Sequence, residues 1–197
     1  MDKVIVDAAV VICVRDAPAG KQVLLVQRAL HLNSHAGEVA LPGGKWEEGD
    51  KDLATTALRE AFEEVGLKAA DVAHLQAMPS RFTRQGIRVT PFVAELVVVS
   101  GQQLQLLACT QELQALFWMP LEIVLTDQRE RTDIFERAGK EYWAPVYRFD
   151  GYCVWGFTAR LLVDYVNCYG GGAITRKHNA PERHYADRAV LEKITPR

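Results

Sequence analysis

Three glutamates stand close together in one predicted helix of this chain. Glu60, Glu63 and Glu64 lie within residues 59–67, shortly after the pair Gly43-Gly44. At roughly 100° per helical residue, their side chains fall within an arc of about 100°. Hard divalent cations such as Mg²⁺ or Mn²⁺ prefer carboxylate and water oxygens, and they commonly serve enzymes that act on phosphate groups. The three carboxylates therefore predict a metal site.

The other side of the same helix is apolar. Its spacing predicts a buried face made of Ala54, Leu58, Ala61, Phe62 and Val65. A solvated acidic stripe on an amphipathic helix is the alternative interpretation of the glutamates. The preceding glycine pair favours the metal site, because glycine lets the backbone approach a ligand closely and the helix begins a short loop later.

The segment from Gly44 to Leu67 resembles the motif of the Nudix hydrolases, G-x5-E-x7-R-E-U-x-E-E-x-G-U, in which U is aliphatic. Two features depart from it: Asp50 fills the first Glu position, and eight residues rather than seven separate it from Arg59. Both are similar to the coenzyme A diphosphatase branch of that family, which opens G-G-x-x-D-x-x-D. Here Glu47 replaces the first Asp of that opening.

A second motif of that branch, L-L-T-x-R-[SA]-x3-R-x3-G-x3-F-P-G-G, is similar to residues 24–44, with its spacing kept. The chain differs from it at Val26, Asn33 and Leu41. Asn33 stands where the branch has an arginine, so a fixed charge and a bidentate phosphate donor are missing there. With later similar segments included, the resemblance covers about residues 4–168.

The resemblance implies an α/β fold, the Nudix α/β/α sandwich with a mixed β-sheet. The predicted elements agree, since strands and helices alternate irregularly rather than as βαβ units. Residues 1–170 are interpreted as the Nudix hydrolase domain. Residues 171–197 lose apolar periodicity and are interpreted as a flexible or loosely docked C-terminal tail. A role of this tail in dimer contacts or in binding substrate phosphate is the alternative, which leaves a homodimer open.

Several elements are expected from local signals. Residues 4–14 and 22–28 predict a hairpin across a Pro/Gly turn, and Asp52 or Thr55 is expected to cap a helix that ends near Gly66. Pro91 predicts an edge or bulge position in its strand. Further strands are expected over 38–41, 72–78, 88–99 and 142–149, and helices over 120–125 and 158–166.

The resemblance also implies roles for the acidic residues. Glu60 and Glu64, one helical turn apart, are the leading metal ligands, and the Gly43 carbonyl is a further ligand. Glu63 is interpreted as a ligand of a second ion or as the general base. Glu112, before the segment at 117–121, is the other candidate base, with an exposed loop charge as its alternative.

Basic and polar residues outside the acidic helix are candidates for substrate recognition. Inside that helix, the resemblance implies that Arg59 pairs with a carboxylate and fixes its rotamer. Arg28, Asn33 and His35 precede the glycine pair and are interpreted as substrate-binding residues. A second basic cluster, suited to a 3′-phosphate or simply to solvent, consists of Arg81, Arg84 and Arg88.

The composition limits the partners. A net charge of −2 over 197 residues supplies no basic field for a polyanion, so nucleic acid binding is disfavoured. No apolar run approaches the ~20 residues needed to cross a bilayer. The four cysteines show no C-x-x-C spacing, so structural zinc is disfavoured and free thiols in a reducing cytoplasm are expected.

Together, these features predict a cytoplasmic hydrolase that uses Mg²⁺ or Mn²⁺ to cleave a small nucleotide-like substrate. The resemblance implies coenzyme A or an acyl-CoA as the substrate, with 3′,5′-ADP and 4′-phosphopantetheine, or its acyl form, as products. Asn33 keeps open another nucleoside diphosphate derivative, such as ADP-ribose or NADH. A nucleotide-binding module without hydrolysis is the alternative from a different class.

Overall fold

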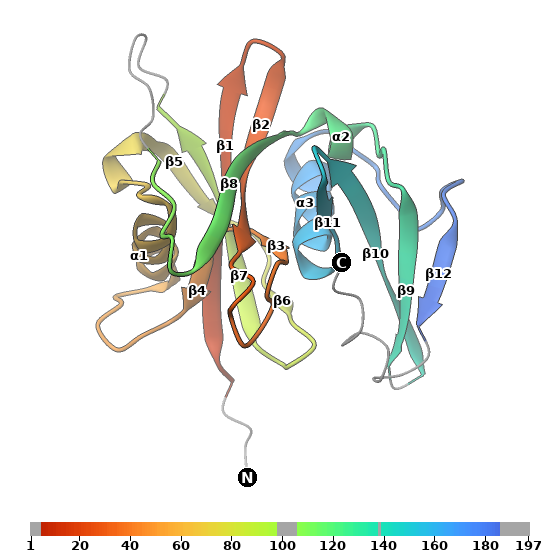
Figure 1. Ribbon diagram of the computed structural model, residues 1–197, viewed down its shortest axis with the longest axis horizontal. Helices are drawn as coiled ribbons and strands as arrows, with labels where there is room; N and C mark the ends of the chain where they lie inside the picture. Colours follow the sequence, from red (N-terminus) through yellow and green to blue (C-terminus); the bar gives the residue numbers. More distant parts are fainter. Residues whose placement is uncertain (1–4, 98–105, 138, 186–197) are drawn as a thin grey trace.

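The computed structural model describes residues 5–97, 106–137 and 139–185, and its core is an eight-stranded mixed sheet (Figure 1). The predicted hairpin is present as β1 (Asp7–Ala17) and β2 (Gly20–Arg28), which pair antiparallel. The strand order is β3-β2-β1-β7-β5, while β4 pairs with β1, β6 with β7 and β8 with β2. The remaining strands are β3 (Val39–Ala40), β4 (Gly43–Lys45), β5 (Val72–Ala77), β6 (Arg81–Phe82), β7 (Arg88–Leu96) and β8 (Leu113–Pro120). Because β1 and β7 run parallel and the other pairs antiparallel, the predicted mixed sheet is confirmed.

Helices cover both faces of this sheet. The side chains of β1 alternate, so that Val11 and Cys13 pack in the cluster beneath α1 (Leu53–Val65), while Ile12 and Val14 pack in the cluster beneath α3 (Gly156–Tyr169). The short helices are η1 (Ala69–Asp71) and α2 (Glu122–Leu125). The expected α/β/α sandwich is therefore confirmed (Figure 1). None of the helices in the described residues has the length and apolar character needed to span a bilayer.

A second sheet of four strands lies beyond α3 (Figure 1). Its order is β11 (Tyr152–Val154), β10 (Lys140–Phe149), β9 (Arg131–Arg137) and β12 (Glu182–Tyr185). Strands β9 and β12 were not predicted. Strand β12 pairs in parallel with β9, and the Asn167 side chain exchanges two hydrogen bonds with the Ile174 backbone. The described part of the 171–197 segment is thus docked, whereas the domain boundary at Gly170 stays a prediction and residues 186–197 lie outside the described residues.

Pro91 occupies an interior strand, so its predicted edge or bulge position was wrong. The proline is tolerated because it lies where one neighbouring strand ends and the next begins. Ala77 of β5 pairs with Phe92, and Arg81 of β6 pairs with Val89. Between these two pairs the Pro91 carbonyl accepts a hydrogen bond from Met78 N at 2.8 Å.

The ends of α1 were predicted from local signals, but its buried face was not. Asp52 caps the helix by accepting from Thr55 N at 2.8 Å, and Gly66 ends it in the left-handed region. Ala61 and Val65 are fully buried as predicted, but Phe62 is 55% exposed, so its predicted burial was wrong. The helix is rotated about its axis, so that the buried face also includes Ala57 and Glu64.

This rotation of α1 predicts opposite tolerances at two adjacent positions. Ala61→Leu should destabilise the fold by about 1–3 kcal/mol, because Ala61 is fully enclosed against the sheet and extra methylenes overpack it. Phe62→Ala should change the free energy of unfolding by less than about 1 kcal/mol, because most of that ring is already in solvent. Urea unfolding of both variants measures the difference. A larger loss in Phe62→Ala would contradict the observed helix orientation.

Candidate active site

The glycine pair brings the backbone of β4 against the acidic edge of α1. Gly43 has φ +151°, and a Cβ there would overlap the Ala9 carbonyl of β1. A Cβ on Gly44 would overlap the carboxylate of Glu60. Glycine is therefore required at position 43, and at position 44 a side chain would displace the Glu60 carboxylate.

Glu64 is the buried acid of the site, with 5% of its surface exposed. It accepts a hydrogen bond from the Gly43 N–H at 2.9 Å. Burial raises the pKa of Glu64 to about 7, and the charges of Glu60 and Glu112 also raise it. The Gly43 hydrogen bond and the Arg28 charge act in the opposite direction. A carboxyl in this position is neutral at mildly acidic pH unless a cation binds beside it.

Arg59 holds the other carboxylates around the start of α1. It binds Asp50 with two hydrogen bonds of 3.0 Å each, and its Nη1 donates to Glu60 and Glu63 at 3.1 Å each. The guanidinium holds the pKa of Asp50 well below its usual range, and these partners raise the pKa of Arg59. Asp50 fills the first Glu position of the sequence motif but was given no role from sequence. Because Asp50 and Arg59 both occupy positions of the sequence motif, their pairing could have been proposed from sequence.

The three predicted glutamate ligands differ in their surroundings. The Glu60 side chain is 16% exposed and lies against Gly44, whereas Glu63 is 55% exposed and paired with Arg59. Burial is the main reason that the pKa of Glu60 is raised. Within residues 5–97, 106–137 and 139–185, no three His, Cys, Asp or Glu side chains are close enough to hold a metal ion.

Of the predicted ligands, Glu60 and Glu64 fit a hard cation. Glu60 and Glu64 supply carboxylate oxygens, and their mutual repulsion in a partly dehydrated position would be relieved by a positive charge between them. Glu63 is 55% exposed and shares the Nη1 of Arg59 with Glu60. The role of the Gly43 carbonyl as a ligand stays a prediction, because Gly43 contacts Glu64 through its N–H.

The charges of Arg28 and Glu112 both act on Glu64. Arg28 ends β2, and the next residue, Ala29, donates its N–H to the Glu112 carbonyl at 2.8 Å. The chain is also fixed there by Cys109 N, which donates to the Glu64 carbonyl at 2.8 Å. The Nε of Arg28 is buried without a hydrogen-bond partner, which makes it a donor in need of an acceptor. Both residues thus lie close to the buried acid.

Asn33 and His35 lie in the exposed loop between β2 and β3. His35 has φ +55°, and its Nδ1 is 2.9 Å from Glu38 Oε2. The Glu38 contact raises the pKa of His35, while the charges of Arg28 and Arg84 lower it. The structure therefore brings His35 near Arg28 and Arg84, and Asn33 is exposed in the same loop.

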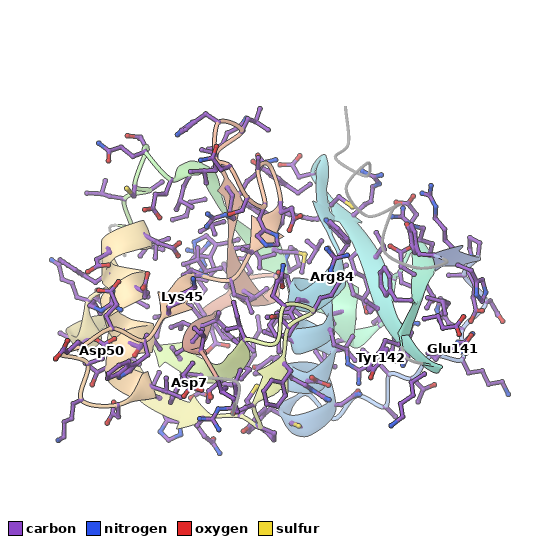
Figure 2. All side chains as sticks on the ribbon, turned by 90° about the horizontal axis from the view of Figure 1, so that it is seen from below. Asp7, Lys45, Asp50, Arg84, Glu141 and Tyr142 are labelled. Atoms are coloured by element: carbon purple, nitrogen blue, oxygen red, sulfur yellow. The ribbon has the colours of Figure 1, made fainter. Side chains whose placement is uncertain are left out.

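The second basic cluster predicted from sequence is divided in the structure. Arg81 forms two hydrogen bonds with Asp164 of α3, at 2.7 and 2.8 Å, and Arg88 forms two with Asp7 of β1, at 2.6 and 2.8 Å. Arg84 lies in the turn between β6 and β7, and the view in Figure 2 draws it between Lys45 and Tyr142. Two of the three arginines are thus held by acids on different elements, and a phosphate-binding role of this cluster stays a prediction.

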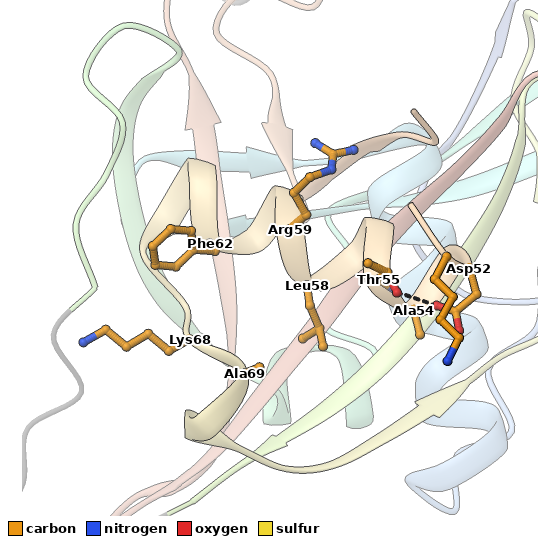
Figure 3. Close-up of a pocket in the computed structure, with 9 residues that line it drawn as sticks. Asp52, Ala54, Thr55, Leu58, Arg59, Phe62, Lys68 and Ala69 are labelled. Carbon is orange, nitrogen blue, oxygen red and sulfur yellow. Dashed lines mark hydrogen bonds between the residues drawn. The ribbon is translucent and has the colours of Figure 1, made fainter. Parts of the chain in front are cut away.

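A shallow hollow of about 650 Å³ lies on another side of α1 (Figure 3). Leu58 and Phe62 form its apolar part, beside Lys68 and Ala69. Glu60 and Glu64 do not line it. The candidate site is therefore the contact between α1 and the glycine loop, and not this hollow.

Comparison with known proteins was consistent with the fold and the motif. A family profile described as NUDIX domain matches residues 6–138. Nudix hydrolase 15, mitochondrial, of Arabidopsis thaliana is 35% identical over 163 residues, which are 79% of this chain and 56% of that protein. An uncharacterized Nudix hydrolase, NudL, of Salmonella newport is 37% identical over 139 residues, 71% of this chain and 70% of that protein.

One solved structure extends the likeness to most of the chain. The MutT/nudix family protein of Enterococcus faecalis has a TM-score of 0.56 and 15% identity, covering 87% of this chain and 64% of that chain. At this identity the likeness concerns the fold alone. The chain spans only 56% of the length of the mitochondrial plant relative.

The raised pKa of Glu64 predicts a pH-dependent effect on stability. Between the ordinary carboxyl pKa and about 7, the unfolded chain ionises while the folded chain does not, so the stability of the metal-free protein falls as pH rises. Glu64→Gln removes this loss. In EDTA, the free energy of unfolding of Glu64→Gln relative to that of the unmodified protein should therefore rise by on the order of 2 kcal/mol from pH 5 to pH 8.

Urea unfolding at both pH values measures this gain, and Glu63→Gln, the same change at a 55% exposed position, is the control. An equal effect of Glu64→Gln at pH 5 and pH 8 would contradict the raised pKa.

Proposed function

The chain belongs to the Nudix family, and on that premise we propose that it is a metal-dependent hydrolase of the diphosphate linkage in coenzyme A or an acyl-CoA. The products are 3′,5′-ADP and 4′-phosphopantetheine or its acyl form. The observation that carries the proposal is the buried Glu64 beside Glu60, in contact with the Gly43-Gly44 backbone. This arrangement keeps two carboxylates partly dehydrated and close together, as a cation site requires.

Mg²⁺ or Mn²⁺ bound there would lower the pKa of an attacking water and offset the charge that develops on the phosphate oxygens. Glu60 and Glu64 would hold the cation, and Arg59 would keep Glu60 in its rotamer through the 3.1 Å contact. Arg28 would bind a phosphate oxygen of the substrate, since its buried Nε lacks an acceptor. These groups would position the diphosphate before the reaction.

A carboxylate near the attacking water would accept its proton. Of the two candidate bases, Glu112 is favoured, because its charge acts on Glu64 and its carbonyl accepts from Ala29, next to Arg28. Both carboxylates are exposed, but Glu63 is paired with Arg59. A proton would therefore pass to the Glu112 carboxylate rather than to that of Glu63.

Coenzyme A as the substrate is supported by the motif over residues 24–44 and by the Asp50 spacing. Asp50 is accommodated with two hydrogen bonds to Arg59, so the departure from the general motif leaves a complete ion pair. Asn33 favours the second candidate, another nucleoside diphosphate derivative such as ADP-ribose or NADH, because that exposed loop position carries no positive charge. A protein that binds nucleotides without hydrolysing them would show no turnover with any added metal ion.

Two further parts of the proposal concern the surroundings of the protein. A cytoplasmic, reducing compartment is supported by Cys13, Cys109, Cys153 and Cys168, all of which are free thiols. A homodimer stays a prediction, which analytical ultracentrifugation of the full chain checks.

Activity should require added Mg²⁺ or Mn²⁺ and disappear with chelator. The proposed ligands are all oxygen atoms, which cannot polarise the phosphate or the attacking water without a bound cation. Hydrolysis of coenzyme A is measured in excess EDTA and after the cation is restored. Full turnover in EDTA would contradict the metal-dependent mechanism.

Glu60→Gln and Glu64→Gln should each lower kcat on the order of 10²-fold or more, equivalent to about 2.7 kcal/mol of barrier, with the fold retained. Glu112→Gln should lower kcat more than Glu63→Gln, since the Glu112 charge acts on Glu64 whereas Glu63 is paired with Arg59. Circular dichroism controls for folding. Near-normal kcat in both Glu60→Gln and Glu64→Gln would place the metal elsewhere.

The substrate assignment is tested by kcat/KM for coenzyme A, ADP-ribose, NADH and dinucleoside polyphosphates in parallel. Coenzyme A should have the highest value. Asn33→Arg should lower KM for coenzyme A more than for ADP-ribose, because it restores a phosphate donor. A protein that prefers ADP-ribose would overturn the coenzyme A assignment and leave the diphosphatase mechanism intact.

A further inference from the structure

Two loops that are distant in sequence bring cationic side chains together outside the acidic site. One is the loop between β2 and β3, which carries His35, and the other is the turn between β6 and β7, which carries Arg84. Figure 1 shows both loops side by side at the lower edge of the main sheet. Their proximity agrees with the effect of the Arg84 charge on the imidazole of His35.

Arg28 connects this pair to the acidic site. Its charge acts on Glu64 on one side and on His35 on the other. Positive charge therefore continues from the buried acid, through Arg28, to the two loops. The buried Nε of Arg28, which has no hydrogen-bond partner, lies along this path. A substrate that carried negative charge only at the reacting diphosphate would not need the far end of the path.

Resting on the proposed function, we propose that His35 and Arg84 form a second phosphate site that binds a phosphate monoester of the substrate separate from its diphosphate. The 3′-phosphate on the ribose of coenzyme A has this chemistry. ADP-ribose and NADH lack such a group, so the site would select between the two substrate classes that Asn33 leaves open.

The backbone of the first loop supports a defined position for His35. The loop is closed by hydrogen bonds from Gly37 N to the Arg28 carbonyl at 3.1 Å and from Glu38 N to the His35 carbonyl at 3.2 Å. Gly37 has φ +72° and His35 φ +55°, a conformation that a non-glycine residue adopts only when its surroundings require it.

The charge state of His35 also suits an anion. Its Nδ1 contacts Glu38, which favours the protonated ring and leaves Nε2 as a second donor. The charged groups that act on the ring are Glu38, which raises its pKa, and Arg28 and Arg84, which lower it. A phosphate beside the two loops would offset the repulsion among these three cations.

Binding of adenosine 3′,5′-bisphosphate and of AMP, which differ only in the 3′-phosphate, tests the site directly. Isothermal titration in EDTA makes the comparison independent of the proposed cation. The unmodified protein should bind the bisphosphate about tenfold more tightly than AMP, and Arg84→Ala and His35→Ala should each remove most of this preference. Both side chains are exposed, so their truncation should leave the fold intact.

Arg81→Ala is the matched control, because it removes the same charge from the same segment but breaks the ion pair with Asp164 instead. It should keep the preference for the bisphosphate. Equal affinities for the two ligands, a preference that survives in both Arg84→Ala and His35→Ala, or an equal loss in Arg81→Ala would each overturn the second phosphate site.

The ratio of kcat/KM for coenzyme A to that for 3′-dephospho-coenzyme A separates this inference from the proposed function. A ratio that falls about tenfold in Arg84→Ala supports both. Hydrolysis of the two compounds with a ratio near one would leave the function standing and overturn the second site. Preferential binding of the bisphosphate without hydrolysis of coenzyme A would support the second site and reject the proposed function.

Discussion

The contact between the Gly43-Gly44 backbone and the acidic edge of α1 is the interaction on which the site depends. Because these glycines belong to β4, which is paired with β1, the contact fixes how α1 is rotated above the main sheet. That rotation turns Ala57 and Ala61 into the core and leaves Phe62 in solvent. Core packing and the position of Glu64 are therefore set by the same contact.

The carboxylates around this contact differ in whether they have an ion-pair partner. Arg59 pairs with Asp50, Glu60 and Glu63, while Glu64 is buried and has a backbone N–H and the Arg28 charge as its favourable partners. Burying a carboxylate without a direct ion-pair partner is unfavourable. The fold tolerates this at one position, and a bound cation would remove the penalty there. The electrostatics of the site and the packing of α1 thus both depend on Glu64.

The second sheet ties distant loops to the main sheet. Thr158 at the start of α3 donates to the Val39 carbonyl at 3.0 Å, and the rings of Phe117 and Tyr152 stack with centroids 3.8 Å apart. Arg81 connects β6 to α3 through Asp164. These contacts hold the ends of β2, β3 and β6 at one edge, where Arg28, His35 and Arg84 lie. Helix α3 and the second sheet therefore contribute to the geometry around the site.

The sequence by itself determined the elements whose signals are local. The β1–β2 hairpin, the Asp52 cap and the Gly66 end of α1 were predicted because each depends on residues a few positions apart. The metal site at Glu60 and Glu64 was also predicted from local spacing, since the two residues are one turn apart, and it stays a prediction. Only the tertiary structure decided which face of α1 is buried, which acids hold Arg81 and Arg88, and that β9 and β12 pair in parallel. These outcomes join residues about 50 to 80 positions apart, and their free energy depends on how whole elements pack, which no local pattern encodes.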